Sequence, residues 1–215
     1  MSDLNMQFVR EFFELHLFHV LTHWQHDAIT RISDAASLLF VEHTNPEAHP
    51  NIDFLLHPNQ VDLLHLAVVE VRAWHADRFY PSVIESSPVL GHVASDDVRQ
   101  HAQSVFGTPE FTTILVISEL PASPQPRQRA LDLLRQLGIG HVVEFATLLQ
   151  DILTRISAHG HYAPSQTLQT IRLLKRYNFV RRQQLEFPFP LEAPPSSTPP
   201  AVHAEVPPQD AAPEE

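Results

Sequence analysis

The stretch HLAVVEVRAW, residues 65–74, is an apolar run that carries a Glu and an Arg two positions apart. Its β-branched and apolar residues predict a strand, and the side chains of a strand alternate between the two faces of a sheet. Glu70 and Arg72 therefore point to the same face, and the other face of this strand is wholly apolar. Because burying a lone charge costs several kcal/mol, the two charges must be paired or bound to something.

Strands and helices are predicted on both sides of this run. Short apolar runs indicate strands, and apolar residues that recur with a period near 3.6 indicate helices. In chain order we expect a helix over 4–28, strands over 37–43, 52–57 and 63–74, helical segments over 81–106, a strand over 112–120, a helix over 124–138, a strand over 140–145, and helices over 146–159 and 165–180. The first three strands are close enough in sequence for an antiparallel meander, and the later strands follow helices, as in an α/β layer fold.

Composition predicts one folded domain and a tail. The chain has 215 residues, of which 43% are hydrophobic, enough for one core of ordinary size. We expect a single α/β domain over residues 1–185. Residues 186–215 are rich in Pro, Ala and acidic residues and hold few large apolar ones, so they are predicted to be disordered.

The same composition narrows the function. The chain has no Cys, no apolar run near the roughly 20 residues of a membrane span, and no signal-peptide pattern at its start. These features predict a cytoplasmic protein without membrane association. The formal net charge of −11 argues against a general affinity for nucleic acid, because polyanions repel each other.

The predicted order of elements, with an acid on the second strand and Glu-x-Arg on the third, resembles the restriction-endonuclease-like fold of the PD-(D/E)xK nuclease superfamily. The resemblance covers roughly residues 5–156 and implies a central mixed sheet flanked by helices. It places Asp53 and Glu70 at the metal-binding acids and Arg72 at the position of the motif's Lys.

The resemblance also implies a chemistry. Two carboxylates would hold a Mg²⁺ ion, which lowers the pKa of a bound water and stabilises charge on a scissile phosphate. Gln100 would orient the phosphate or the water, and Glu11 or Glu14 on the first helix would assist.

Arg72 departs from the family pattern. Arg stays protonated and is a planar fork, whereas Lys is a compact point charge. Lys175 is the only Lys among 14 basic residues, so Arg72 is explained by a general replacement of Lys with the function retained. The other interpretation is an inactive nuclease fold in which Glu70 and Arg72 form a buried structural pair.

Four His residues recur at spacings of three, four and three: His16, His19, His23 and His26. On a helix they would form one row, and the pair four residues apart has the spacing of zinc ligands. No acid lies between that pair as in the metalloprotease motif, so a polar rim beside the core is the other interpretation.

Two further segments have functional and structural interpretations. The loop after the central strand contains His75, Asp77 and Arg78, which would either line the mouth of a site or form a polar turn. A basic helix near the end of the domain would either bind nucleic-acid phosphates or expose a solvated face. Its basic residues are Arg172, Lys175 and Arg176, and its expected attachments to the core are Ile171, Leu174 and Phe179.

Two functions follow from these features. The first is a non-catalytic interaction module that docks a protein partner through the first helix, the His row or the Pro-rich tail. The second is a metal-dependent nuclease that hydrolyses phosphodiester bonds in DNA. The acidic charge and the scarcity of Lys favour the first, and the charges in HLAVVEVRAW favour the second.

Overall fold

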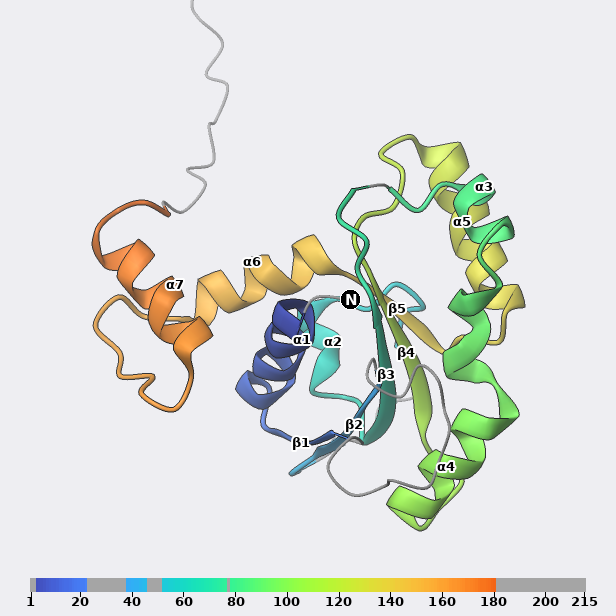
Figure 1. Ribbon diagram of the computed structural model, residues 1–215, viewed down its shortest axis with the longest axis horizontal. Helices are drawn as coiled ribbons and strands as arrows, with labels where there is room; N and C mark the ends of the chain where they lie inside the picture. The colour runs from blue at the N-terminus through green and yellow to red at the C-terminus, as the bar shows by residue number, and fades with distance from the viewer. Residues whose placement is uncertain (1–2, 23–37, 46–51, 77, 181–215) are drawn as a thin grey trace, which may run out of the picture. The chain divides into compact units, whose positions relative to one another are not determined.

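A computed structural model of the chain describes residues 3–22, 38–45, 52–76 and 78–180 (Figure 1). All of these residues belong to one compact unit, Met1–Arg182. The second unit, Gln183–Glu215, lies outside the described residues, as does the tail predicted for 186–215.

The described residues form both helices and strands. In chain order they are α1 (Asp3–Leu15), β1 (Phe18–Thr22), β2 (Leu38–His43), α2 (Pro58–Val61), β3 (Leu66–Arg72), α3 (Pro81–Glu85), the 3-10 helix η3 (Pro88–Ala94), α4 (Asp96–Phe106), β4 (Thr112–Ile117), α5 (Pro124–Gln136), β5 (His141–Glu144), α6 (Phe145–Arg155) and α7 (Gln166–Arg176). None of these helices is long and apolar enough to cross a membrane.

The five strands form one mixed sheet in the order β1-β2-β3-β4-β5. The pairs β1–β2 and β2–β3 are antiparallel, whereas β3–β4 and β4–β5 are parallel. Helices lie between the parallel strands in sequence, because a parallel pair needs a crossover. The parallel strands end level with one another, since Arg72 is in register with Ile117, and Ile117 with Glu144.

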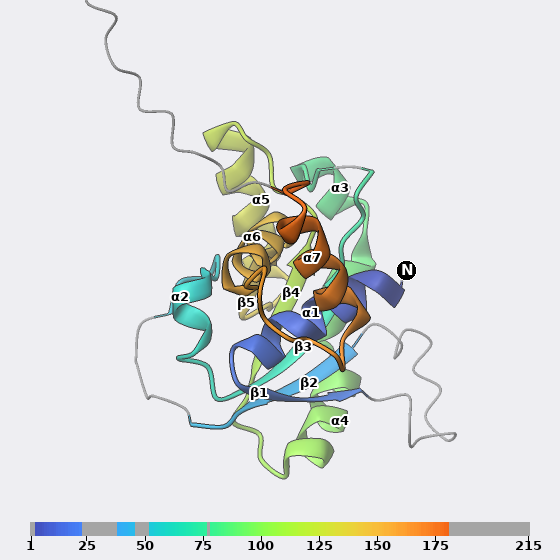
Figure 2. The same cartoon turned by 90° about the vertical axis from the view of Figure 1, so that its left-hand side faces the viewer.

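Helices cover both faces of the sheet (Figures 1 and 2). On one face α1, α6 and α7 pack over a core that includes Phe12, Phe13 and Ile152. On the other face α3, η3, α4 and α5 pack over a core that includes Phe40 and Leu134. The expected α/β sheet flanked by helices is therefore confirmed at this level of architecture.

The alternation predicted for the central strand is confirmed in β3. Ala67, Val69 and Val71 contribute to the core under α1, and Val68 to the core under α4 and α5. Every residue of β3 is buried. Glu70 and Arg72 therefore lie inside the protein, on the face that α3, η3, α4 and α5 cover.

The long helix predicted over 4–28 is wrong. Helix α1 ends at Leu15, and β1 begins at Phe18 after Leu17 adopts a left-handed φ of 62°. The apolar residues that follow fit both a helical and a two-residue period in the sequence. In the structure the two-residue period applies, since Phe18 is buried and His19 is exposed. Pairing with β2 selects the strand.

The strand predicted over 52–57 is also wrong. This segment makes a single bridge, in which Leu55 pairs with Val142 of β5. Val142 donates to the Phe54 carbonyl, and Leu56 donates to the Val142 carbonyl, both at 2.8 Å. Because Pro58 begins α2, the extended segment stops there. The meander therefore consists of β1, β2 and β3, and residues 54–56 instead cover the edge of β5.

Candidate functional site

Glu70 forms an ion pair with Arg72 inside the sheet. The Glu70 side chain is fully buried, and Arg72 is 7% exposed. Arg72 donates through Nε to Glu70 Oε1 at 2.8 Å, and its Nη2 lies 2.5 Å from the same oxygen. The charge of Glu70 is thus paired with that of Arg72, two residues along the same strand.

A third group, His92 of η3, contacts the same oxygen. His92 Nδ1 lies 3.2 Å from Glu70 Oε1. The other oxygen, Oε2, has no hydrogen-bond partner among the described residues. Burial raises the pKa of Glu70 above its ordinary value of 4.5, although Arg72 and His92 act in the opposite direction.

Asp53 is separated from the Glu70–Arg72 pair and lies beyond the β5 edge of the sheet. Its side chain is exposed and accepts a hydrogen bond from Gln60 Nε2 at 2.9 Å. Asp53 precedes the bridge at Leu55, so β4 and β5 lie between Asp53 and β3. Three strand spacings correspond to roughly 14 Å, and carboxylate oxygens that share a Mg²⁺ ion lie about 2.1 Å from it. Asp53 and Glu70 cannot hold one ion in this arrangement.

The resemblance places its first acid on the second strand of the meander. In the structure this second strand is β2, and the segment that contains Asp53 is not a strand of the meander. Strand β2 begins at Leu38, opposite Glu70. The positions before Leu38, residues 23–37, lie outside the described residues.

The other residues assigned by the resemblance do not join Glu70. Gln100 is exposed on α4. Glu11 and Glu14 belong to α1, which packs on the opposite face of the sheet. Glu11 is buried and accepts from Gln7 Nε2 at 2.6 Å, and Glu14 accepts from Arg10 Nε at 2.7 Å.

The fit of a metal ion to these residues is poor. Within the described ranges, no cluster of three or more His, Cys, Asp or Glu side chains is placed to hold one. The guanidinium of Arg72 also contacts Glu70 Oε1, one of the two oxygens that a cation would use. The residues assigned to Mg²⁺ therefore do not form a site for it in this structure.

The two described members of the His row do not lie on one helix. His16 follows α1 and is buried, whereas His19 is exposed on β1; His23 and His26 lie outside the described residues. The two ring nitrogens of His16 face two carboxylates. Nδ1 is 2.6 Å from Asp62 Oδ1, and Nε2 is 2.9 Å from Asp151 Oδ2. His16 thus fastens the end of α1 to α6.

The basic residues of α7 have separate roles. Lys175 donates through Nζ to the carbonyl oxygens of Leu153, at 2.6 Å, and Ile156, and both lie at the end of α6. Arg172 donates to Gln169 Oε1 at 2.7 Å, and Arg176 is exposed. Lys175 therefore serves as a cap for α6, and the two Arg residues remain near the surface.

The predicted attachment of α7 is correct at only one of three positions. Ile171 is buried, and it packs in the core together with Leu168. Leu174 is 38% exposed and Phe179 is 79% exposed. A helical period alone could not show that α7 lies at the edge of the unit, with only one narrow side in contact.

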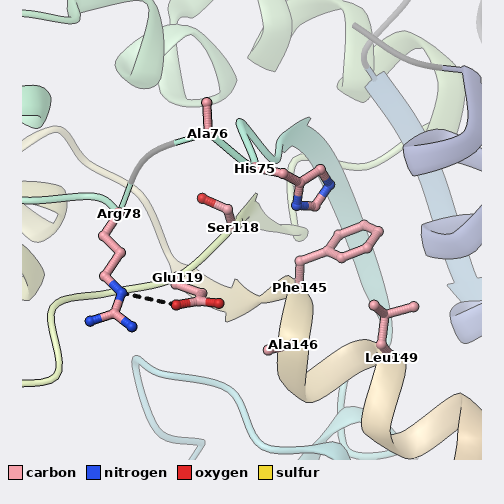
Figure 3. Close-up of a pocket in the computed structure, with 8 residues that line it drawn as sticks. All are labelled: His75, Ala76, Arg78, Ser118, Glu119, Phe145, Ala146 and Leu149. Carbon is pink, nitrogen blue, oxygen red and sulfur yellow. Dashed lines mark hydrogen bonds and ion pairs between the residues drawn. The ribbon is translucent and has the colours of Figure 1, made fainter.

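A pocket lies beyond the ends of the parallel strands (Figure 3). Its walls come from three segments that follow β3, β4 and β5, and they include His75, Arg78, Ser118, Glu119 and Phe145. Figure 3 shows His75 and Phe145 on one side of the pocket and the Arg78–Glu119 ion pair on the other.

The loop after β3 contributes two side chains to this pocket. Of the three residues named for that loop, His75 and Arg78 line the pocket, and Asp77 lies outside the described residues. Ser118 and Glu119 also line the pocket, and neither was predicted as a site residue. Both directly follow a predicted buried strand, and that position at the carboxyl end of a parallel strand is the signal that could have indicated them.

The fold and these sites define an α/β protein with a five-stranded mixed sheet between two layers of helices. Comparison of the chain with protein-family models found no match. Comparisons with curated proteins and with solved structures found no match either.

Proposed function

We propose that the protein is a non-catalytic interaction module that binds an acidic, amphipathic segment of a protein partner at the end of α7. The observation that carries this proposal is an exposed apolar surface beside two Arg residues. The surface consists of Leu173, Leu174, Tyr177 and Phe179, with exposed fractions of 43%, 38%, 66% and 79%.

The helical geometry sets the apolar and basic residues side by side. Leu173 and Tyr177 are one turn apart and share a side of α7, and Arg172 and Arg176 share the adjacent side. The buried contact with the core is made by Ile171 on a different side. A helix whose exposed side is apolar is a common feature of protein-binding surfaces.

The local charges on α7 favour acidic groups on the partner, whereas the formal net charge of the whole chain is −11. Apolar side chains of the partner would cover Leu173 and Tyr177, while its carboxylates would face Arg172 and Arg176. Aromatic and Arg side chains are also the residue types that contribute most to the free energy of protein association. Only two of the three predicted phosphate-binding residues project from α7, because Lys175 is held by α6.

A peptide titration of the full chain tests this proposal. Fluorescence anisotropy would compare a labelled helical peptide of Leu and Glu, the same peptide with Lys in place of Glu, and a single-stranded oligonucleotide. We expect only the acidic peptide to bind, and more weakly as salt is added, because ion pairs at a surface are screened.

Substitutions would locate the binding surface. The double variant Leu173→Ser/Tyr177→Ser should weaken binding about tenfold or more, as expected for loss of central interface contacts. The control is Leu4→Ser, because Leu4 is 53% exposed on α1 and lies outside the proposed surface. Binding of the oligonucleotide, lost on changing Arg172 and Arg176 to Gln, would contradict the proposal and support a nucleic-acid interface.

The alternative function is a metal-dependent nuclease that uses Glu70. What favours it is a buried carboxylate oxygen, Oε2, that lacks a hydrogen bond among the described residues. What opposes it is the position of Arg72 and the separation of Asp53 from β3.

Thermal melts with EDTA and with Mn²⁺ decide between the two. A bound ion would raise the stability of the wild type by about 2.7 kcal/mol at a hundred times Kd. The Glu70→Gln variant would lose that increase, because it removes a charged oxygen ligand. On the non-catalytic proposal the wild type shows no stabilisation by Mn²⁺, and a metal-dependent increase that Glu70→Gln abolishes would overturn it.

A further inference from the structure

The pocket beyond the parallel strands is placed where α/β proteins bind small molecules. Strands β3, β4 and β5 end in one row, and the segments that follow each of them line a cavity of about 290 Å³. Ligands of open α/β sheets bind in crevices outside the carboxyl ends of the strands. A cavity of this volume is at the small end of the range for ligand sites, so it suits a molecule of only a few heavy atoms.

The imidazole of His75 is held in one orientation by two other elements. Asn5 of α1 donates through Nδ2 to the Ala73 carbonyl at 3.0 Å, so its Oδ1 faces His75 Nε2 at 3.1 Å. Because Oδ1 can only accept, the hydrogen-bond network assigns the hydrogen to Nε2. The ring also packs edge-on against Phe145, with 4.8 Å between the centroids.

The second nitrogen of His75 is the one available to a ligand. In the neutral ring, a hydrogen on Nε2 leaves Nδ1 as an acceptor. Figure 3 shows this nitrogen on the side of the ring that faces Ser118. A ligand in the pocket would therefore meet a hydrogen-bond acceptor, and a hydroxyl group of the ligand is its natural partner.

The opposite wall carries the ion pair of Arg78 and Glu119. Arg78 donates through Nε to Glu119 Oε2 at 3.1 Å, and both side chains are about half exposed. This single bond occupies one of the three guanidinium nitrogens, so the other two can donate to an anion. Phe145 and Leu149 add an apolar side to the cavity.

The start of α6 adds to the attraction for an anion. Ala146, in the first turn of α6, lines the pocket, and this turn has no acidic residue. Glu144 precedes the helix but does not cap it, because its carboxylate accepts from Leu120 N and from Arg127. The first backbone N–H groups of a helix favour negative charge.

The geometry points to a binding site for a small hydroxylated anion, whose acidic group is bound by Arg78 and whose hydroxyl donates to His75 Nδ1. A 2-hydroxycarboxylate and a hydrogen phosphate share this chemistry. The site does not depend on the proposed role of α7, since the two surfaces have no residue in common.

Titration of the ¹⁵N-labelled full chain tests this site, with the Ala146 amide resonance as the readout. The probes are lactate, propionate and inorganic phosphate, each at constant ionic strength. We expect a saturable shift with lactate or phosphate. Lactate should bind about two- to tenfold more tightly than propionate, which is the worth of one hydrogen bond. Phosphate binding without lactate binding, or the reverse, identifies the acidic group that the site accepts.

Three variants connect the shift to the named side chains. Arg78→Gln should weaken binding about tenfold or more, because it removes a charged donor. His75→Phe keeps the ring and should abolish the preference for lactate over propionate. The control is Arg129→Gln, because Arg129 is exposed and paired with Glu85 on a different surface. No saturable shift with any probe, saturable binding of lactate and propionate with equal affinity, or equal effects of the two Arg variants would overturn the inference.

Discussion

The charge of Glu70 lies in the middle of the sheet and is neutralised by a residue of the same strand. Arg72 lies two positions along the same strand, so the alternation of β3 brings both groups to one face. Removing one member of such a buried pair leaves an uncompensated charge, whereas the intact pair contributes little net stability. Replacing either residue alone is therefore expected to lower the free energy of unfolding more than replacing both with apolar residues.

The raised pKa of Glu70 makes stability depend on pH. Burial raises the pKa of Glu70 above the value of 4.5 that it has when unfolded. In the interval between the two pKa values the folded state holds more protons than the unfolded state, so its stability falls as pH rises. Each unit of pKa difference corresponds to about 1.4 kcal/mol.

Urea denaturation of the wild type and of Glu70→Gln at a series of pH values measures this effect. The variant lacks the titrating group and serves as the reference for all other carboxylates. The free energy of unfolding of the wild type, relative to the variant, should decrease as pH rises from about the ordinary glutamate pKa through the raised one. A relative stability that increases with pH would show that pairing with Arg72 outweighs burial.

At the scale of elements, Lys175 joins α7 to the end of α6. Its ammonium group donates to two carbonyl oxygens that a helix C-terminus leaves without partners inside the helix. A cation at this end also interacts favourably with the helix dipole. Lys175→Met should therefore lower the free energy of unfolding by about 1–2 kcal/mol.

The matched control is Arg176→Met, the next residue on the same helix. Arg176 is exposed, so its replacement should change the free energy of unfolding by less than about 0.5 kcal/mol. Urea denaturation of both variants gives the comparison. Equal losses would mean that Lys175 acts only through the net charge of α7.

The elements predicted correctly from sequence are those with one clear period or with a capping residue. β3 and β4 are rich in β-branched and apolar residues, and α4 begins after Ser95, whose hydroxyl accepts from Val98 N. The residues of β1 fit two periods at once, and only the pairing with β2 decides between them. The segment 52–57 has the composition of a strand, but it finds a partner for one residue only.

The candidate site was predictable in its parts and not in its assembly. The sequence is enough to place Glu70 and Arg72 on one face, because that needs only the alternation of a strand. The separation of Asp53 from Glu70 depends on which strand lies beside which, and local pattern does not determine strand order. The pocket that contains His75 and Arg78 forms only where three separate segments meet. The sequence could therefore indicate the loop after β3, but not the residues from the other two segments.

At the scale of the whole molecule, the composition after Phe189 predicts that folding does not need it. Residues 188–215 hold nine of the 19 prolines and no Lys or Arg. A chain that ends at Phe189 should keep a melting temperature within about two degrees of the full length, since unpacked termini tolerate change. Differential scanning calorimetry measures this, and a large decrease would show that the last residues contribute to the packed unit.

The bridge between Leu55 and Val142 has a consequence for how the chain reaches its fold. It joins two segments that are separated in the sequence by β3, β4 and the helices that follow them. Contacts so distant in sequence slow folding, because a large loop must close before they form. Until it forms, β5 is an uncovered edge strand that can pair with another chain. The yield of refolding should therefore fall as protein concentration rises, with aggregation competing against a slow intramolecular closure.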